Sequence, residues 1–228
     1  MIPATRFERS GDPPVRGFLH HPAQGSRASL VLTHGAGGNC GSSLLVMIAL
    51  AFAEAGLTVL RCDLPFRQAR PHGPPRGDGS QDREGLRRAV AALREEVPGR
   101  VFLGGQSYGG RQASLLCASE PKLADGLLLL SYPLHPPGQH AALRTSHFPR
   151  LTTDALFVHG TRDPFATSDE MRAAMTLIPA RTRLLEFEGL GHDLATRRKI
   201  EPTTVSRLLA AFTEFFGIES ELERAFAD

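Results

Sequence analysis

Short apolar runs alternate along this chain with longer segments in which apolar side chains recur every three or four positions. The first pattern predicts β-strands, and the second predicts helices. We expect strands at residues 29–33, 57–62, 100–103, 126–131, 155–159 and 183–187, with a weaker strand at 15–20. We expect helices from residue 42 or 43 to 55, and at 82–97, 110–119, 167–177 and 202–216. Strands and helices therefore follow one another over most of the length.

Proline and glycine separate these predicted elements. Gly56 follows the first predicted helix at the position where a left-handed residue commonly ends a helix, and Pro98 and Gly99 end the second. Residues 63–79 contain four prolines and three glycines, so we expect a loop there. The alternation predicts an α/β fold in which helices cover both faces of a mainly parallel sheet. Such sheets bind ligands on the loops at the carboxyl ends of their strands.

Composition favours a folded protein of one domain, over residues 1–228. A chain of 228 residues with 41% hydrophobic content can bury a full core. The formal net charge is only +2 and the basic residues are dispersed, so we expect no nucleic acid and no membrane as partners. The longest apolar run, residues 44–53, is too short to span a bilayer, and residues 1–14 lack the apolar centre of a secretory signal.

The three cysteines have no CxxC or zinc-type spacing and suit reduced thiols. We therefore expect a cytoplasmic protein.

One serine stands between glycines directly after a predicted strand. Residues 105–109 read Gly-Gln-Ser-Tyr-Gly, which is the G-x-S-x-G pattern of a nucleophile elbow, a sharp turn between a strand and a helix. A serine hydroxyl is a weak nucleophile at neutral pH and needs a histidine as base, which in turn needs a carboxylate. Asp163 follows the strand at 155–159, and His192 follows the strand at 183–187. Their order after Ser107 predicts a Ser107–His192–Asp163 triad.

Ester or amide cleavage also develops negative charge on the carbonyl oxygen, which backbone N–H groups stabilise. We expect one donor to be the N–H of Tyr108, directly after Ser107. The glycine-rich loop at 34–39 is expected to supply the other, from Ala36, with Gly37 as the alternative.

Other chemistries match the sequence less well. Cys62 and Cys117 have no histidine at a motif spacing. The histidines at 135, 140 and 147 fit no known metal-site spacing, so we expect loop histidines and no metal. The loop at 35–38 lacks the Lys-Ser/Thr of a phosphate-binding loop, and no dinucleotide fingerprint is found. We expect no cofactor.

These motifs together resemble the α/β-hydrolase superfamily, in particular its small dienelactone-hydrolase-like members. A closer resemblance is to the branch of testis-expressed hydrolase-like proteins and the hydrolase-like subunit of a histone acetyltransferase complex. The segments that carry it are residues 33–39, 63–67, 104–111, 132–138 and 159–165. The resemblance implies a twisted, mostly parallel sheet of eight, or seven, strands, with Ser107 as nucleophile, Asp163 as acid and His192 as base.

The resemblance also bears on substrate binding. Larger relatives insert a helical cap where this chain has only residues 132–153, so we expect no large cap domain and a shallow, open cleft. Arg67, His135, Arg144 and His147 lie on loops at this end of the sheet and are candidates for binding a polar or anionic part of the substrate; loop stabilisation is the alternative. Phe66 and Tyr108 are candidate apolar walls.

The leading hypothesis is a serine hydrolase that acts on a small-molecule ester or related acyl compound. A thioesterase or peptidase with the same triad, and a non-catalytic interaction protein on a hydrolase fold, are the alternatives.

Overall fold

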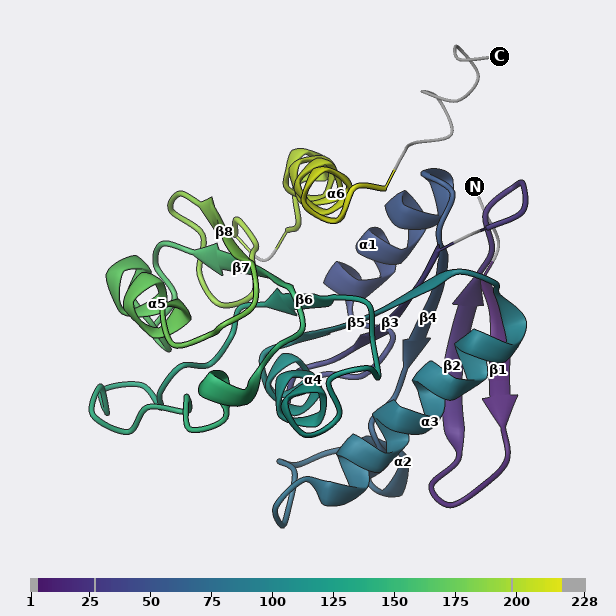
Figure 1. The fold of residues 1–228 in the computed structure, drawn as a ribbon, viewed down its shortest axis with the longest axis horizontal. Helices are drawn as coiled ribbons and strands as arrows, with labels where there is room; N and C mark the ends of the chain where they lie inside the picture. The colour runs from purple at the N-terminus through teal and green to yellow at the C-terminus, as the bar shows by residue number, and fades with distance from the viewer. Residues whose placement is uncertain (1–3, 27, 198, 219–228) are drawn as a thin grey trace.

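The computed structural model describes residues 4–26, 28–197 and 199–218, which form one eight-stranded sheet with helices on both faces (Figure 1). The strands are β1 (Ala4–Arg9), β2 (Val15–His20), β3 (Ala28–Thr33), β4 (Thr58–Cys62), β5 (Arg100–Gln106), β6 (Leu127–Leu130), β7 (Ala155–Gly160) and β8 (Thr182–Phe187). The helices are α1 (Ser43–Glu54), α2 (Pro65–Ala69), α3 (Ser80–Glu96), α4 (Tyr108–Ser119), α5 (Ser168–Met175) and α6 (Pro202–Phe216), with a 3₁₀-helix η1 (Phe148–Arg150).

The strand order is β1-β2-β4-β3-β5-β6-β7-β8. Strands β1 and β2 pair antiparallel to each other, and β2 pairs antiparallel to β4. All remaining pairs are parallel. The expectation of an α/β-hydrolase fold with a mostly parallel sheet is thereby confirmed, and the number of strands is eight.

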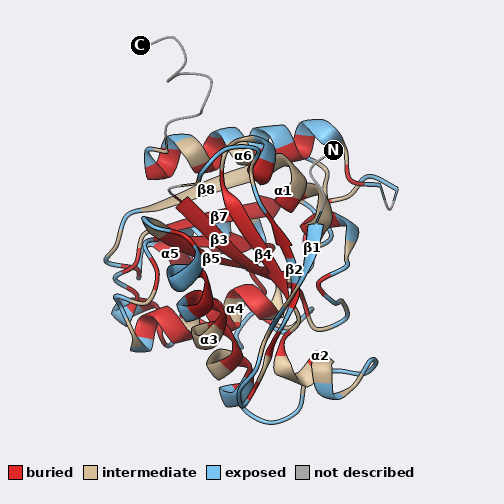
Figure 2. Ribbon diagram, turned by 90° about the vertical axis from the view of Figure 1, so that its right-hand side faces the viewer, coloured by how far each residue is buried: buried red, intermediate tan, exposed pale blue. Residues whose placement is uncertain are grey.

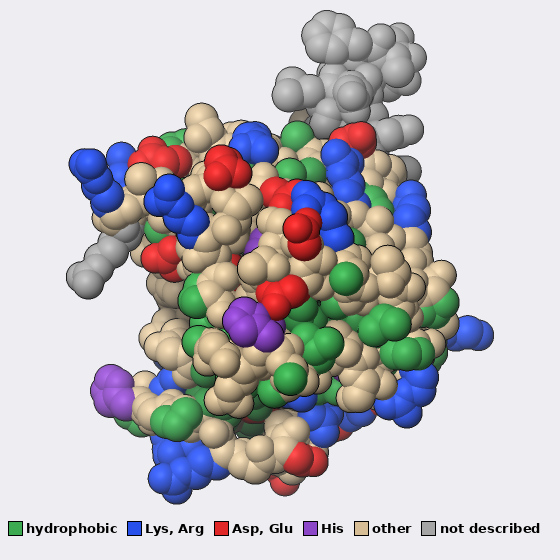
Figure 3. Space-filling model, turned by 90° about the vertical axis from the view of Figure 1, so that its left-hand side faces the viewer, with side chains coloured by type: hydrophobic (Ala, Val, Ile, Leu, Met, Phe, Trp, Pro, Cys, Tyr) green, Lys and Arg blue, Asp and Glu red, His purple; other side chains and the backbone are tan. Residues whose placement is uncertain are grey.

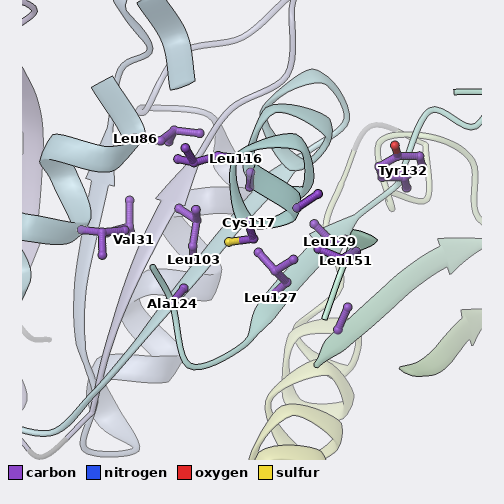
Figure 4. Packing of buried hydrophobic residues seen from close by; sticks show 14 of the residues in the cluster. Val31, Leu86, Leu103, Leu116, Cys117, Ala124, Leu127, Leu129, Tyr132 and Leu151 are labelled. Carbon is purple, nitrogen blue, oxygen red and sulfur yellow. The ribbon is translucent and has the colours of Figure 1, made fainter. Parts of the chain in front are cut away.

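Alternate side chains of the central strands pack into two hydrophobic layers. In β6, Leu127 and Leu129 belong to the layer beneath α3, α4 and α5, and Leu128 and Leu130 belong to the layer beneath α1 and α6. Figure 4 shows the first layer, in which residues of β3, β5 and β6 meet side chains of α3 and α4. The central strands are buried on both faces, as Figure 2 shows in red. This explains why they read as continuous apolar runs.

Strand β1, helix α2 and the 3₁₀-helix η1 lie where the sequence pattern predicts no element. Strand β1 lies at the edge of the sheet with most of its side chains exposed, so it has no apolar run; its backbone pairs with β2 from Ala4–His20 to Arg9–Val15. The short helix α2 lies within the expected loop at 63–79 and begins with Pro65 in its first turn, where proline is tolerated.

The parallel register brings the candidate residues to one edge of the sheet. Thr33 at the end of β3 pairs with Gly105 in β5, and Gly160 at the end of β7 pairs with Phe187 at the end of β8. The loops that follow these strands are therefore neighbours. Between β6 and β7 the chain forms only the 3₁₀-helix η1, so this edge carries no cap domain. Within the described ranges, no helix combines the length and apolar character needed to cross a bilayer.

Candidate active site

Ser107 lies on a strained turn between β5 and α4. Its backbone angles are φ 50° and ψ −113°, which non-glycine residues rarely adopt. The turn is held on both sides, because the N–H of Ser107 donates to Leu130 O at 2.8 Å and its carbonyl accepts from Arg111 N at 2.9 Å. Backbone strain of this kind costs about 1–3 kcal/mol and is found mainly at functional sites. The geometry is that of the expected nucleophile elbow.

Glycine is required on both sides of this turn. A Cβ on Gly105 would lie 2.6 Å from the carbonyl carbon of Gly109, and a Cβ on Gly109 would lie 2.6 Å from His34 O. Real side chains do not approach backbone atoms this closely. The two glycines therefore let β5, the start of α4 and the loop after β3 converge around Ser107.

The structure brings Ser107, His192 and Asp163 into one hydrogen-bonded chain. His192 Nε2 lies 2.8 Å from Ser107 Oγ, and His192 Nδ1 lies 2.8 Å from Asp163 Oδ2. A carboxylate only accepts hydrogen bonds, so Nδ1–H donates to Asp163 and Nε2 is left to accept from the serine hydroxyl. The Asp163 side chain is fully buried, whereas that of His192 is 24% exposed.

The loops that carry Asp163 and His192 are joined to each other. Arg162 N donates to Leu190 O at 2.9 Å, and Gly189 N donates to Thr161 Oγ1 at 2.9 Å. The ring of Phe165 stacks on His192 with 4.2 Å between ring centroids. These contacts limit the rotation of the imidazole and keep it between Ser107 and Asp163.

Among the described residues, the backbone N–H groups of Ala36, Gly37 and Tyr108, which lie near Ser107, have no acceptor. Tyr108 is the first residue of α4, where helical N–H groups lack intrahelical partners. The loop after β3 is close enough to act with it, because a Cβ on Gly35 would lie 3.3 Å from Ser107 Cβ. Both expected sources of oxyanion donors therefore flank the serine.

His34 orients the first peptide group of this loop. Its Nδ1 lies 2.8 Å from Gly35 O, and its Nε2 accepts from Leu64 N at 3.1 Å. Burial lowers the pKa of His34, so its ring is neutral at pH 7 and Nδ1 carries the proton. Gly38 N also donates to Gly35 O at 3.1 Å. With Gly35 O held from this side, the N–H of Ala36 in the same peptide group points the opposite way.

Arg67 orients the next peptide group of this loop, the one between Ala36 and Gly37. Its guanidinium donates to Ala36 O at 2.7 Å and to Gly38 O at 2.8 Å on the loop after β3. It also donates to Pro71 O at 2.7 Å and to Gly73 O at 3.2 Å on the loop after α2. The residue is only 7% exposed. These internal partners favour a role in holding two loops together over the expected contact with substrate.

The side chains of His135 and His147 also have internal partners. His135 is fully buried, and its Nδ1 lies 2.7 Å from Pro136 O. His147 Nε2 lies 2.8 Å from Ser114 Oγ on α4, and burial lowers the pKa of His147 to about 4. Both arrangements favour structural roles over substrate binding. Arg144 likewise donates to the carbonyl of Pro133 at 3.3 Å.

Aromatic side chains form one wall beside the oxyanion donors. Phe66 packs edge-on against Tyr108 with 5.5 Å between ring centroids and lies 5.6 Å from the ring of His34. Asp82, at the start of α3, fixes this wall by accepting from Tyr108 Oη at 2.6 Å and from Phe66 N at 2.9 Å. The sequence reasoning overlooked Asp82, because a polar residue in the first turn of a helix is common there.

Two hollows lie on the loops around α2. One of about 290 Å³ borders Ala36 and Gly37 and is closed by Arg67 and residues 71–74. A larger one of about 650 Å³ lies between residues 12–16, α2 and residues 76–82, away from the triad. The smaller hollow reaches the loop after β3 at Ala36 and Gly37, but its lining includes none of Ser107, Tyr108 and His192.

The cysteine thiols lack the character of nucleophiles. Burial raises the pKa of Cys40 and of Cys117 to about 12, and it raises the pKa of Cys62 as well. A thiol needs its thiolate form to react, so all three are inert at neutral pH.

Comparison with known proteins assigns the chain to a family. Residues 26–217 match the family described as an alpha/beta hydrolase domain, and the chain belongs to it.

Solved structures of similar fold include a dienelactone hydrolase from Anabaena variabilis, with a TM-score of 0.75 and 19% identity over 96% of this chain and 99% of that one. Est1E from Butyrivibrio proteoclasticus has a TM-score of 0.74 and 15% identity over 94% and 99% of the two chains. An α/β serine hydrolase without lid from Xanthomonas campestris has a TM-score of 0.68 and 17% identity over 92% of each chain. Similarity at these identities shows the shared fold.

Proposed function

We propose that this protein is a serine hydrolase that cleaves a small carboxylic ester or a related acyl compound. The observation that carries the proposal is the hydrogen-bonded chain from Ser107 through His192 to buried Asp163, with 2.8 Å at each step. The strained backbone of Ser107 and the free N–H groups of Ala36 and Tyr108 support it. A scaffold protein would not need these groups to converge.

In the proposed reaction Ser107 Oγ attacks the carbonyl carbon while its proton passes to His192 Nε2. Asp163 stabilises the imidazolium, and the backbone N–H groups of Tyr108 and Ala36 or Gly37 stabilise the oxyanion. Collapse of the tetrahedral intermediate breaks the bond to the leaving alcohol, which takes the proton from His192. Water then gives a proton to His192 and attacks the carbonyl carbon of the acyl-enzyme. Collapse of this second intermediate releases the carboxylic acid, and His192 returns the proton to Ser107 Oγ.

The open cleft supports a small substrate. The chain between β6 and β7 forms no cap over the end of the sheet that carries Ser107. Est1E, which shares the fold, has a structure with ferulic acid bound. We therefore propose short or compact acyl groups as the preferred substrates.

A fluorophosphonate probe tests the proposed nucleophile. The probe should label the wild-type protein and fail to label Ser107→Ala, because it reacts only with an activated serine. Ser206→Ala is the matched control, since Ser206 is an exposed serine on α6 and should be without effect. Equal labelling of wild type and Ser107→Ala, or no labelling of either, would refute the proposal.

A substrate panel distinguishes the related activities. p-Nitrophenyl esters of increasing acyl length, the corresponding thioesters and short peptide anilides should be compared at equal concentrations. We expect the short esters to be turned over fastest. The resemblance to a branch with a complex-bound member motivates the interaction-protein alternative, which predicts no turnover and no probe labelling.

A further inference from the structure

Two histidines and a glutamate meet on the α5 side of the molecule, outside the triad. His135 follows β6, His140 lies further along the same connection, and Glu170 is in the first turn of α5. His140 Nδ1 lies 2.7 Å from Glu170 Oε1, and His135 Nε2 lies 3.4 Å from Glu170 Oε2. In the described part of the chain, this is the one group of three such side chains whose ligand atoms all lie within 4.8 Å of one another.

His135 is oriented as a metal ligand would be. Its Nδ1 lies 2.7 Å from the carbonyl oxygen of Pro136, which can only accept, so Nδ1 carries the proton. The lone pair is therefore on Nε2, the atom that faces Glu170. Metal-binding histidines commonly donate their second ring N–H to a backbone carbonyl in this way. The ring is buried, so this orientation is held by packing.

Glu170 provides a fixed carboxylate. Its Oε2 accepts from Thr167 N at 2.7 Å, as part of a capping box at the start of α5. The Thr167 hydroxyl also donates to Oε2, at 2.9 Å. A glutamate side chain is negative at neutral pH. The second oxygen, Oε1, is directed at His140.

We propose that His135 Nε2, His140 Nδ1 and Glu170 form a binding site for a divalent cation of the zinc class. Two imidazole nitrogens and a carboxylate are a ligand set that Zn²⁺ and Co²⁺ accept, with solvent at the fourth position. Tetrahedral Zn²⁺ separates its ligand atoms by about 3.3 Å. The 2.7 Å between His140 Nδ1 and Glu170 Oε1 is shorter than this separation, so the His140 ring must move outward to admit an ion. That side chain is 63% exposed, so it is free to adjust and leaves a path for the ion.

The site adjoins the triad through two contacts. His135 N donates to Phe165 O at 3.1 Å, and the Phe165 ring stacks on His192. A bound ion would join the connection after β6 to the start of α5, the segments that flank the loop of Asp163. Figure 3 shows this side of the molecule, on which histidine and acidic side chains are exposed. The inference depends on these ligands and not on hydrolase activity.

Sequence reasoning rejected a metal site because the histidines at 135, 140 and 147 have no recognised spacing. In the structure His147 contacts Ser114 and lies outside this group. The third member is Glu170, which contacts His140 and is 30 residues further along the chain.

Metal titration of the full-length protein tests the proposal. After treatment with chelator and dialysis, the protein is titrated with ZnCl₂ by calorimetry and with CoCl₂ by visible absorption. We expect one ion per chain, with the absorption bands of tetrahedral Co²⁺ and a raised melting temperature in Zn²⁺. His140→Ala and Glu170→Gln should each weaken binding by about tenfold or more.

Two further variants provide controls. His21→Ala removes an exposed histidine elsewhere and should bind as wild type. His192→Ala should also retain binding, which separates the site from adventitious binding at the triad. His140→Ala is expected to fold, because its side chain is largely exposed. Absence of saturable binding by wild type, unchanged binding by His140→Ala, or loss of binding in His192→Ala would overturn the proposal.

Discussion

Replacement of Arg67 by methionine tests how the oxyanion donors are held. The substitution keeps an unbranched side chain and removes the guanidinium that contacts Ala36 O at 2.7 Å and Gly38 O at 2.8 Å. Ala36 O and the N–H of Gly37 belong to the same planar peptide group, so fixing one fixes the direction of the other. Without Arg67 this peptide group should sample orientations in which the oxyanion donors are misplaced.

The magnitude follows from the number and burial of the contacts. A hydrogen bond from a charged donor contributes about 1.5–3 kcal/mol. The carbonyls of Pro71 and Gly73 belong to exposed residues that water can reach, so their loss should cost little. The two half-buried carbonyls of Ala36 and Gly38 then account for a loss of about 3 kcal/mol in the free energy of unfolding.

The effect on the reaction should be separate from the effect on stability. If one contact of about 1.5–3 kcal/mol holds the peptide group between Ala36 and Gly37, its loss makes the correct orientation of the Gly37 N–H about 10 to 100 times less populated. We expect the rate of fluorophosphonate labelling, and kcat for a p-nitrophenyl ester, to fall by about that factor. KM should change little, because the oxyanion develops only in the transition state.

The assay compares labelling rates at 25 °C, with circular dichroism and urea unfolding to establish that each variant is folded. Arg70→Met is the matched control, since the Arg70 guanidinium donates only to the exposed Pro74 O at 2.9 Å. Arg67→Lys should recover part of the rate, because one ammonium group cannot reach both loops. Wild-type labelling by folded Arg67→Met would refute this account of the loop.

Three other substitutions address the triad, its wall and the buried histidines. Asp163→Asn keeps the shape of the site and removes the acceptor for His192 Nδ1–H. The rate of probe labelling should therefore fall about 10⁴-fold, while the midpoint of urea unfolding changes little. A labelling rate within tenfold of that of the wild type would contradict the assigned tautomer. Tyr108→Phe removes the hydroxyl that donates to the buried Asp82 carboxylate at 2.6 Å, and it should lower the free energy of unfolding by about 1–3 kcal/mol. Probe labelling should persist, because the backbone N–H of residue 108 remains. Loss of labelling in the folded variant would contradict this. The pKa of His147 is lowered from 6.5 to about 4, so between these values the unfolded chain binds a proton that the folded protein does not. The contribution of His147 to the free energy of unfolding should therefore fall by about 2 kcal/mol from pH 7 to pH 5. Urea unfolding of His147→Gln should show a pH dependence that is smaller than that of the wild type by this amount. Identical pH profiles of the two proteins would contradict this prediction.

The central strands were predictable because they are buried on both faces, which demands apolar side chains at every position, as in β3 and β6. Strand β1 was not predictable for the opposite reason. Its side chains are mostly exposed, and its place at the sheet edge depends on backbone pairing with β2. The boundaries of α4 shifted as well, because the helix begins at Tyr108 directly after the strained serine.

The candidate triad could be proposed from local motifs because each residue follows a strand in a glycine-rich turn. The roles of Arg67, His135 and His147 could not, because a loop residue with a polar side chain has the same sequence pattern whether it faces solvent or the interior. All three are buried, with partners 1 to 35 residues away in the chain. Only the folded chain determines which carbonyls and carboxylates surround them.

The sequence by itself determined the order of strands and helices, the elbow around Ser107 and the loops that carry Asp163 and His192, because these features depend on short-range patterns of burial and turn geometry. Tertiary structure alone decided that Arg67 faces the oxyanion loop and that Glu170 joins His135 and His140. Those contacts connect segments whose neighbours are set by the order and register of the sheet, and no local pattern specifies them.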